Sequence, residues 1–339
     1  MNRSQHESKF ELLKIISILM VIVLHYFNSR MGGGFGNVND GTFNNYFMYY
    51  VESLSIIAVN CFIMITGYFL IVKESIRFRK VTNLVVITVF YGILFLVING
   101  IINNQVGSNW FNLDTLSHAI SPVYDAKWFV GSYIALYLLT PYINKVLKSL
   151  TKKQYLRFLV IYIILFSITP TIFYYISYND RGYGVLSFIM FYAIGGYLRK
   201  YPLKVNKKWL FLLGYLFSTT ITFVLALKVI GHGSFFSYNT IFNVMSTFFL
   251  FMFFSNIKIK SRIINYLAGF TFPIYLIHTD ISIRNYVYNN ILETHRFWNS
   301  GLLYIGHLII TVVITFIVCI MIDILRQYLF RAIGLKKLI

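Results

Sequence analysis

Long apolar runs separated by short polar stretches set the pattern of this chain. A transmembrane helix needs about 20 mostly apolar residues, and ten segments of the sequence come close to this length or exceed it. The sixth is short, and its Gly195-Gly196 pair permits close contact with a neighbouring helix. The pattern predicts an all-α polytopic membrane protein with about ten transmembrane helices. The expected spans are residues 12–29, 46–72, 81–102, 128–147, 155–177, 184–198, 209–230, 239–256, 263–283 and 302–325.

The basic residues predict how these spans are oriented. Cytoplasmic connections of membrane proteins carry an excess of Lys and Arg. If the N-terminus is cytoplasmic and the connections alternate, 24 of the 30 basic residues fall on the cytoplasmic side and 6 on the outside. An error in the number of spans would scramble this asymmetry. We therefore expect both termini to be cytoplasmic.

The composition favours a membrane protein over a soluble one. Hydrophobic residues make up 58% of the 339 residues and charged residues only 12%, against roughly 25% charged residues in soluble proteins. The net charge of +19 is spread in short clusters between apolar runs, which indicates topology rather than nucleic-acid binding. Cys61 and Cys319 lie inside apolar runs, so neither a disulfide nor a metal site is expected. We expect one integral-membrane domain over residues 1–339 and no soluble domain.

Ionisable side chains within the expected spans are candidates for function, because a charge at the bilayer centre costs at least about 2.5–3.5 kcal/mol. Asp323 is expected near the inner face, paired with Arg326 at i, i+3. The others fall in the outer third of the membrane, which suggests a polar cavity open to the outside. Among them, His307 is better explained by a hydrogen bond between helices, and Asp280 could cap or be solvated at the interface. This outer group consists of His25, Glu52, His278, Asp280 and His307.

His25 and Glu52 are the strongest candidates for chemistry. A neutral imidazole accepts a proton near physiological pH, and a nearby carboxylate raises its basicity. Lys14 precedes His25 by eleven residues, a spacing that places both on one helix face, about 16 Å apart along the axis. A cation at the inner mouth and a base further up would fit a channel entered by an anionic cofactor. Lys14 could also be a topological anchor only.

A basic cluster, Arg77-Phe78-Arg79-Lys80, lies at the start of the third expected span. Alternating arginines can each bind a phosphate through two hydrogen bonds, which Lys does less well. Basic connections are also common as topological or lipid-facing segments, and both interpretations stay open. The sequence contains no P-loop and no other signature of a soluble nucleotide-binding enzyme.

Six motifs follow one another over nearly the whole chain. Lys14 and His25 form a basic-residue-x10-His pattern, and the run over residues 62–70 is similar to a Ser-Gly-Phe-Leu element with Thr66 in place of Ser. The next four are Arg77-x-Arg79, a Trp-Phe helix from Trp128 to Pro141, residues 187–198 and residues 272–278. In this order the motifs resemble those of the membrane acyltransferase-3 family, which O-acylates cell-surface polysaccharides and other extracytoplasmic acceptors.

The resemblance implies an acyl-CoA-dependent O-acyltransferase of the bacterial plasma membrane. Acetyl-CoA or another acyl-CoA would be the cytoplasmic donor. The acceptor would be a hydroxyl of a surface polysaccharide, such as capsule, or of a lipid-linked glycan. Neither nucleic acid nor a metal is expected. His25 would either deprotonate this hydroxyl or carry the acyl group covalently, and both mechanisms stay open.

The resemblance also distributes roles over the candidate residues. It implies that His25 is essential and that Arg77 and Arg79 serve the donor, with Lys14 and Lys80 as further donor-binding candidates. Glu52 as the partner of His25 follows from shared depth rather than from the resemblance. The expected substrate-binding residues are Trp128, Tyr275, His278 and Asp280.

Two other functions stay open at this point. A transporter or exporter of a glycan or small polar solute would also suit a polar cavity in the outer third of the membrane. Such a protein should neither bind CoA nor depend on a basic residue at the inner end of the first helix. A non-enzymatic assembly factor of a glycan-synthesis complex is the weaker alternative.

Overall fold

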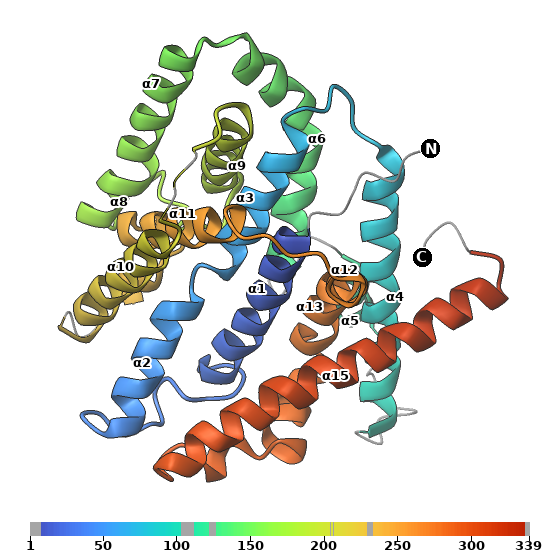
Figure 1. Ribbon diagram of the computed structural model, residues 1–339. Coiled ribbons are helices and arrows are strands. Elements are labelled where there is room, and N and C mark those ends of the chain that lie inside the picture. The colour runs from blue at the N-terminus through green and yellow to red at the C-terminus, as the bar shows by residue number, and fades with distance from the viewer. Residues whose placement is uncertain are drawn as a thin grey trace. The chain divides into compact units, whose positions relative to one another are not determined.

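The computed structural model describes residues 8–102, 112–121, 127–203, 205, 207–228 and 233–335. All regular secondary structure in these residues is helical, which confirms the expected all-α class (Figure 1). Six helical segments are long and apolar enough to cross a membrane, as expected for a membrane protein. They are α1 (Ser8–Phe27), α2 with α3 (Phe43–Ser55 and Ala58–Leu70), α4 (Phe78–Ile102), α7 with α8 (Lys152–Ile163 and Thr169–Ile172), α10 (Trp209–Lys228) and α15 (Leu302–Ala332).

The other four expected spans are also helical, but they are shorter, less apolar or interrupted. The count of ten spans and the orientation of the termini therefore stay predictions. Two further helices, α5 (Leu113–Ile120) and α14 (Arg284–Tyr286), are too short to span. The four segments are α6 (Trp128–Ser149), α9 (Val185–Lys200), α11 (Ile241–Ser255) and the broken pair α12 (Arg262–Leu267) and α13 (Thr271–Thr279).

Two expected spans contain irregularities, and side-chain hydrogen bonds accompany both of them. The α2–α3 segment breaks after Ser55, and Ser53 Oγ donates to the carbonyl oxygen of Tyr49 one turn earlier, an interaction that bends helices. The segment between α7 and α8 is π-helical over residues 164–168. Pro170 has no N–H with which to reach the Phe166 carbonyl. Asn239 Nδ2 donates to that carbonyl instead, at 3.1 Å.

The described residues form two compact units, each assembled from three stretches of sequence. The first lies within residues 1–21, 49–76 and 132–268, and the second within residues 22–48, 77–131 and 269–339.

In the first unit, α3 packs against α9 (Figure 1). Their backbones approach closely at their glycines. A Cβ on Gly67 would lie 2.1 Å from the Tyr192 carbonyl oxygen, and one on Gly195 would lie 2.1 Å from the Met64 carbonyl oxygen. The close helix contact expected at Gly195-Gly196 is therefore confirmed.

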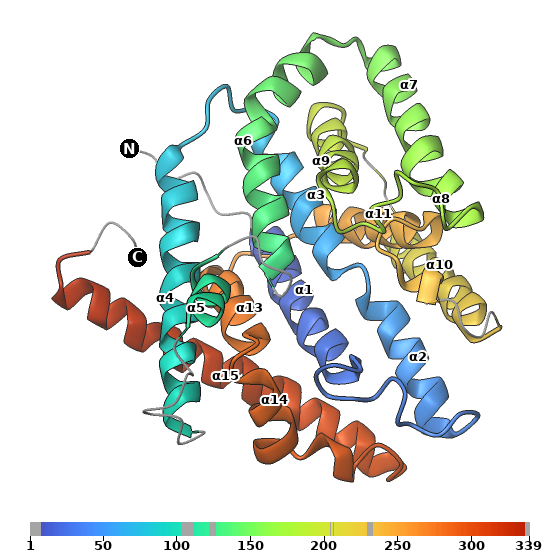
Figure 2. The same cartoon turned by 180° about the vertical axis from the view of Figure 1, so that it is seen from behind.

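In the second unit, α13 packs against α4 and α15, and α5 packs against α4 (Figure 2). A Cβ on Gly92 would lie 1.9 Å from the Ala119 carbonyl oxygen, so α4 and α5 can approach only because this position is glycine. Lys127 Nζ donates to the Ala119 carbonyl at 2.9 Å. A cation at a helix C-terminus donates hydrogen bonds to the terminal carbonyls and is attracted by the negative end of the helix dipole.

The expected pair of Asp323 and Arg326 is confirmed within α15. Arg326 Nε donates to Asp323 Oδ1 at 2.7 Å, and the Tyr91 hydroxyl of α4 donates to the same oxygen at 2.7 Å. Gln327 Nε2 donates to Asp323 Oδ2 at 2.8 Å. The carboxylate is buried but fully provided with donors, which is the condition for a charge to stay in an apolar environment.

Candidate active site

His25 and His278 form a hydrogen-bonded pair in the second unit. Nδ1 of His25, in the last turn of α1, lies 2.8 Å from Nε2 of His278, near the end of α13. The two residues are 253 positions apart in the sequence. Nδ1 of His278 contacts the carbonyl oxygen of Ile274, one turn earlier on α13. His278 is buried, and His25 is partly exposed.

A glycine turn holds the end of α1 on which His25 lies. The backbone N–H of Gly32 donates to the His25 carbonyl at 3.1 Å, and Trp298 Nε1 donates to the Gly32 carbonyl at 2.9 Å. A Cβ on Gly32 would lie 2.0 Å from the Tyr26 carbonyl oxygen, so the turn can close this tightly only with glycine. The backbone at His25 is therefore held by the Gly32 turn and by Trp298, which is distant in the sequence.

Aromatic rings continue from the histidine pair along the second unit. The Tyr275 ring centroid lies 6.5 Å from that of His278 and 5.4 Å from that of Phe129. Trp128 follows at 6.1 Å from Phe129 and is half-buried. Three of the residues expected to bind substrate, namely Trp128, Tyr275 and His278, thus belong to one continuous cluster with His25.

Asp280, the fourth of these residues, is buried directly after α13. Its Oδ1 accepts a 3.0 Å hydrogen bond from the Ser282 backbone N–H. Burial lowers the pKa of the nearby Lys127 ammonium, and the negative charge of Asp280 partly offsets this lowering. Arg284, which sequence reasoning did not single out, interacts electrostatically with His25. No sequence signal pointed to Arg284, because its approach to His25 depends on tertiary packing.

The remaining catalytic and donor candidates on α1 and α2 belong to the first unit. Glu52 is buried in α2, and its Oε2 has no hydrogen-bond partner within the part of the chain that the structure describes. It stays a proposed partner of His25.

Lys14 Nζ donates to both carboxylate oxygens of Glu11, at 3.0 and 3.1 Å. The i, i+3 spacing of Glu11 and Lys14 could have indicated this ion pair from the sequence.

The basic cluster Arg77, Arg79 and Lys80 lies at the start of α4, in the second unit, and all three side chains are exposed. The backbone N–H of Lys80 donates to the Arg77 carbonyl at 2.8 Å, which forms the first turn of the helix. Helix N-termini attract anions through their free N–H groups and their dipole.

Within the residues described, no three His, Cys, Asp or Glu side chains are grouped as a metal site.

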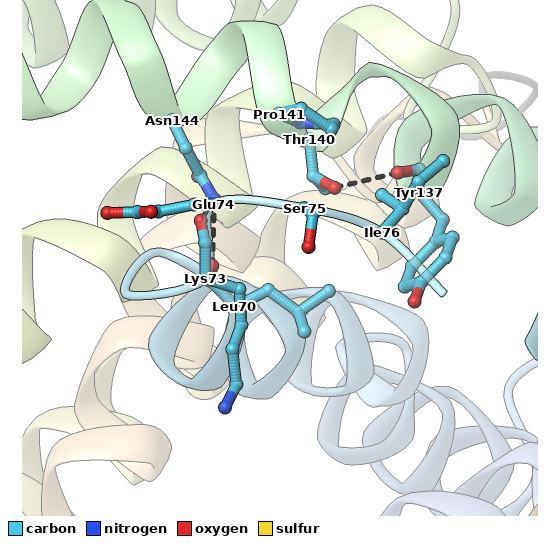
Figure 3. A pocket seen from close by; sticks show the side chains of 9 residues that line it. All are labelled: Leu70, Lys73, Glu74, Ser75, Ile76, Tyr137, Thr140, Pro141 and Asn144. Carbon is cyan, nitrogen blue, oxygen red and sulfur yellow. Dashed lines mark hydrogen bonds between the residues drawn. The ribbon is translucent and has the colours of Figure 1, made fainter. Parts of the chain in front are cut away.

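A recess of about 10 Å³ lies in the first unit, beside the end of α3 (Figure 3). Asn144 Nδ2 donates to the carbonyls of Leu70 and Lys73, at 2.8 and 2.9 Å, and so caps this helix end. The Tyr192 hydroxyl donates to Asn144 Oδ1 at 2.7 Å. A space of this size holds at most about one water molecule, so the recess is too small for a nucleotide or a sugar.

His307 has a structural role, as the sequence predicted. Its Nδ1 lies 2.8 Å from the Tyr26 hydroxyl, and the Phe297 ring stacks on it with centroids 3.9 Å apart. The expected hydrogen bond between helices is confirmed, since Tyr26 lies on α1 and His307 on α15. His307 therefore belongs to the aromatic packing of the second unit rather than to the His25–His278 pair.

Comparison with known proteins identifies the family. No curated protein and no solved structure matches the chain significantly. The sequence profile of the acyltransferase-3 family, described as an acyltransferase domain, matches residues 7–324. This match covers every candidate site residue from Lys14 to Asp280 and most of both units. The chain, with its paired histidines and its basic helix start, belongs to the acyltransferase-3 family.

Proposed function

We propose that this membrane acyltransferase moves an acyl group from cytoplasmic acyl-CoA to a hydroxyl of an extracytoplasmic cell-surface glycan, with His25 as the catalytic residue. Acetyl-CoA is the proposed donor. Family membership supports acyl transfer. The observation that carries the role of His25 is the 2.8 Å hydrogen bond between its Nδ1 and Nε2 of His278, because a general base must be held in a fixed orientation.

The proposed reaction balances without a further reactant. His25 takes the proton of the acceptor hydroxyl while the hydroxyl oxygen bonds to the thioester carbonyl carbon. The carbon–sulfur bond then breaks, and the proton passes to the sulfur of CoA, which leaves as the free thiol. In the covalent alternative, a ring nitrogen of His25 bonds to the thioester carbonyl carbon, the carbon–sulfur bond breaks, and CoA leaves as the thiolate. The acceptor hydroxyl oxygen then bonds to the acyl carbon, the bond from that carbon to His25 breaks, and the hydroxyl proton passes to the thiolate. Both routes require an unprotonated ring nitrogen on His25.

The start of α4 is the proposed binding site for the phosphate groups of the donor. Arg77, Arg79 and Lys80 are exposed there, next to the positive end of the helix dipole. Arginine side chains at this position can bind phosphate oxygens together with the backbone N–H groups of the first helical turn. Lys14, already paired with Glu11, is a secondary candidate for the donor.

The aromatic cluster beside the histidine pair is the proposed acceptor site. Trp128 and Tyr275 would contact the glycan, and Asp280 would accept hydrogen bonds from its hydroxyl groups. Tyr275 is next to His278 in space, so a glycan on this cluster would present its hydroxyl close to His25.

The test is acyl transfer by the purified protein in proteoliposomes. Radiolabelled acetyl-CoA is supplied with a surface glycan freed of its esters by mild alkali, and both labelled glycan and free CoA thiol are measured. We expect His25→Ala to abolish transfer, and the exposed His295 in the same unit provides the matched control His295→Ala. Full transfer by a folded His25→Ala protein would reject the proposed role of His25.

A further inference from the structure

We infer that His278 is a positioning residue, which holds His25 in the tautomer with its proton on Nδ1 and leaves Nε2 as the reacting nitrogen. This inference rests on the proposed function and makes it more specific. It also gives His278 a role different from the substrate contact expected from the sequence.

The ring contacts of His278 determine which of its nitrogens carries the hydrogen. Its Nδ1 contacts the Ile274 carbonyl oxygen, and a carbonyl oxygen can only accept a hydrogen bond. Nδ1 of His278 must therefore carry the hydrogen. A neutral imidazole has a single N–H, so Nε2 of His278 presents a lone pair.

The lone pair on Nε2 of His278 in turn determines which nitrogen of His25 carries the hydrogen. Its Nδ1 lies 2.8 Å from the lone pair on Nε2 of His278, so Nδ1 of His25 must be the donor. The remaining nitrogen of His25, Nε2, then has the free lone pair that proton abstraction or nucleophilic attack requires. Nε2 hydrogen-bonds to no other residue in the described ranges, and the His25 side chain is partly exposed.

The anchor of this chain of hydrogen bonds is local and rigid. Ile274 and His278 lie one turn apart on α13, and both are buried. The carbonyl that fixes the His278 tautomer therefore comes from the helix that carries the ring. This arrangement also stabilises His25 during the reaction. When Nε2 gains a proton, the positive ring keeps its Nδ1 hydrogen bond to a neutral acceptor.

The experiment compares two replacements of His278 in the full-length protein. His278→Gln places a carbonyl oxygen near the former Nε2 and can still accept from His25, whereas His278→Leu has a similar volume and no acceptor. We expect His278→Leu to reduce acyl transfer by about 10²–10⁴-fold, the usual contribution of a positioned general base. We expect His278→Gln to restore a large part of that loss. Size-exclusion profiles and thermal unfolding in detergent establish that both variants fold.

A second readout does not depend on activity. Selective ¹⁵N-histidine labelling, assigned by comparison with His25→Gln, distinguishes the protonated from the unprotonated nitrogen of His25. The inference predicts protonated Nδ1 and unprotonated Nε2 in the wild type and in His278→Gln, and a mixture of tautomers in His278→Leu. An unprotonated Nδ1 in the wild type, or equal activity of all three proteins, would overturn it. Activity retained by His25→Ala would instead reject the proposed function.

Discussion

Arg326 donates a 2.7 Å hydrogen bond from Nε to Oδ1 of Asp323, one turn earlier on α15. Both side chains are almost completely buried, with exposed fractions of 3% and 1%. A buried ion pair often adds little stability compared with apolar residues of the same size, but it becomes costly when one partner is removed. The Tyr91 hydroxyl binds the same carboxylate oxygen, so the pair fixes how α4 meets α15.

We predict that Asp323→Leu alone lowers the free energy of unfolding by about 3–5 kcal/mol, because it leaves the Arg326 charge buried without its carboxylate. The double replacement of Asp323 and Arg326 by Leu should restore most of this stability. Thermal unfolding in detergent measures both effects, and Arg331→Ala, an exposed position on the same helix, is the control. If the double variant is as unstable as the single one, the ion pair is not the cause.

We predict that Gly195→Ala destabilises the first unit, because the added Cβ would lie 2.1 Å from the Met64 carbonyl oxygen. The helices α3 and α9 would have to separate, and overpacking of this kind typically costs about 1–3 kcal/mol. Gly306→Ala is the matched control. Gly306 also lies inside a helix, but a Cβ added there would have no neighbouring atom within 4 Å among the described residues. At this position, Ala should be neutral or stabilise by up to about 1 kcal/mol.

Much of the fold could be predicted from the sequence, because a membrane helix is recorded locally as an apolar run. The pair of Asp323 and Arg326 and the close contact at Gly195 were also predictable, since helix geometry fixes an i, i+3 pair and small residues permit close packing. The irregular turns within the helices could not be predicted from local sequence. The π-helical turn before Pro170 depends on Asn239, whose side chain binds the Phe166 carbonyl from 73 residues away.

The candidate site was predictable only in part. Sequence placed His25 and His278 at one membrane depth, but their hydrogen bond joins residues 253 positions apart and follows from packing. The i−4 relation of Ile274 to His278 was visible in the sequence. Its consequence for His25 depends on the second nitrogen of His278, which tertiary packing places beside His25. Conversely, the spacing of Lys14 and His25 predicts a role in donor entry, whereas the side chain that Lys14 contacts is Glu11, three residues earlier.

We predict that replacing both Arg77 and Arg79 by Ala weakens acyl-CoA binding by at least about tenfold, because each arginine can form charge-assisted hydrogen bonds to phosphate. The effect should appear in KM for acetyl-CoA more than in kcat, since these residues are assigned to binding. Lys152→Ala with Lys153→Ala is the matched control, as both lysines are exposed in the first turn of α7. Equal KM values in all three proteins would contradict the donor assignment.

We predict that Glu52→Gln reduces acyl transfer by about tenfold or more and leaves the thermal stability near that of the wild type. Gln preserves the shape of the buried side chain but cannot become a carboxylate, so it cannot stabilise a positive charge on His25. Glu74→Gln is the control for loss of a carboxylate in the same unit, because Glu74 is exposed and has no proposed role in the reaction. Unchanged transfer by Glu52→Gln would exclude Glu52 from the reaction.

The number of spans can be tested by cysteine accessibility at two exposed positions, Lys153 and Arg296. Cys61 and Cys319, both buried, are first replaced by Ala, and a single cysteine is then introduced at either position. Five of the ten expected spans lie between residues 153 and 296, so the ten-span topology puts the two positions on opposite sides. If only the six long apolar segments cross the membrane, two crossings separate these positions and both lie on one side.

We expect a membrane-impermeant thiol reagent to label Arg296→Cys in intact cells, and Lys153→Cys only after permeabilisation. Labelling of both variants in intact cells would reject the ten-span topology and, with it, the assignment of the donor cluster to the cytoplasmic side.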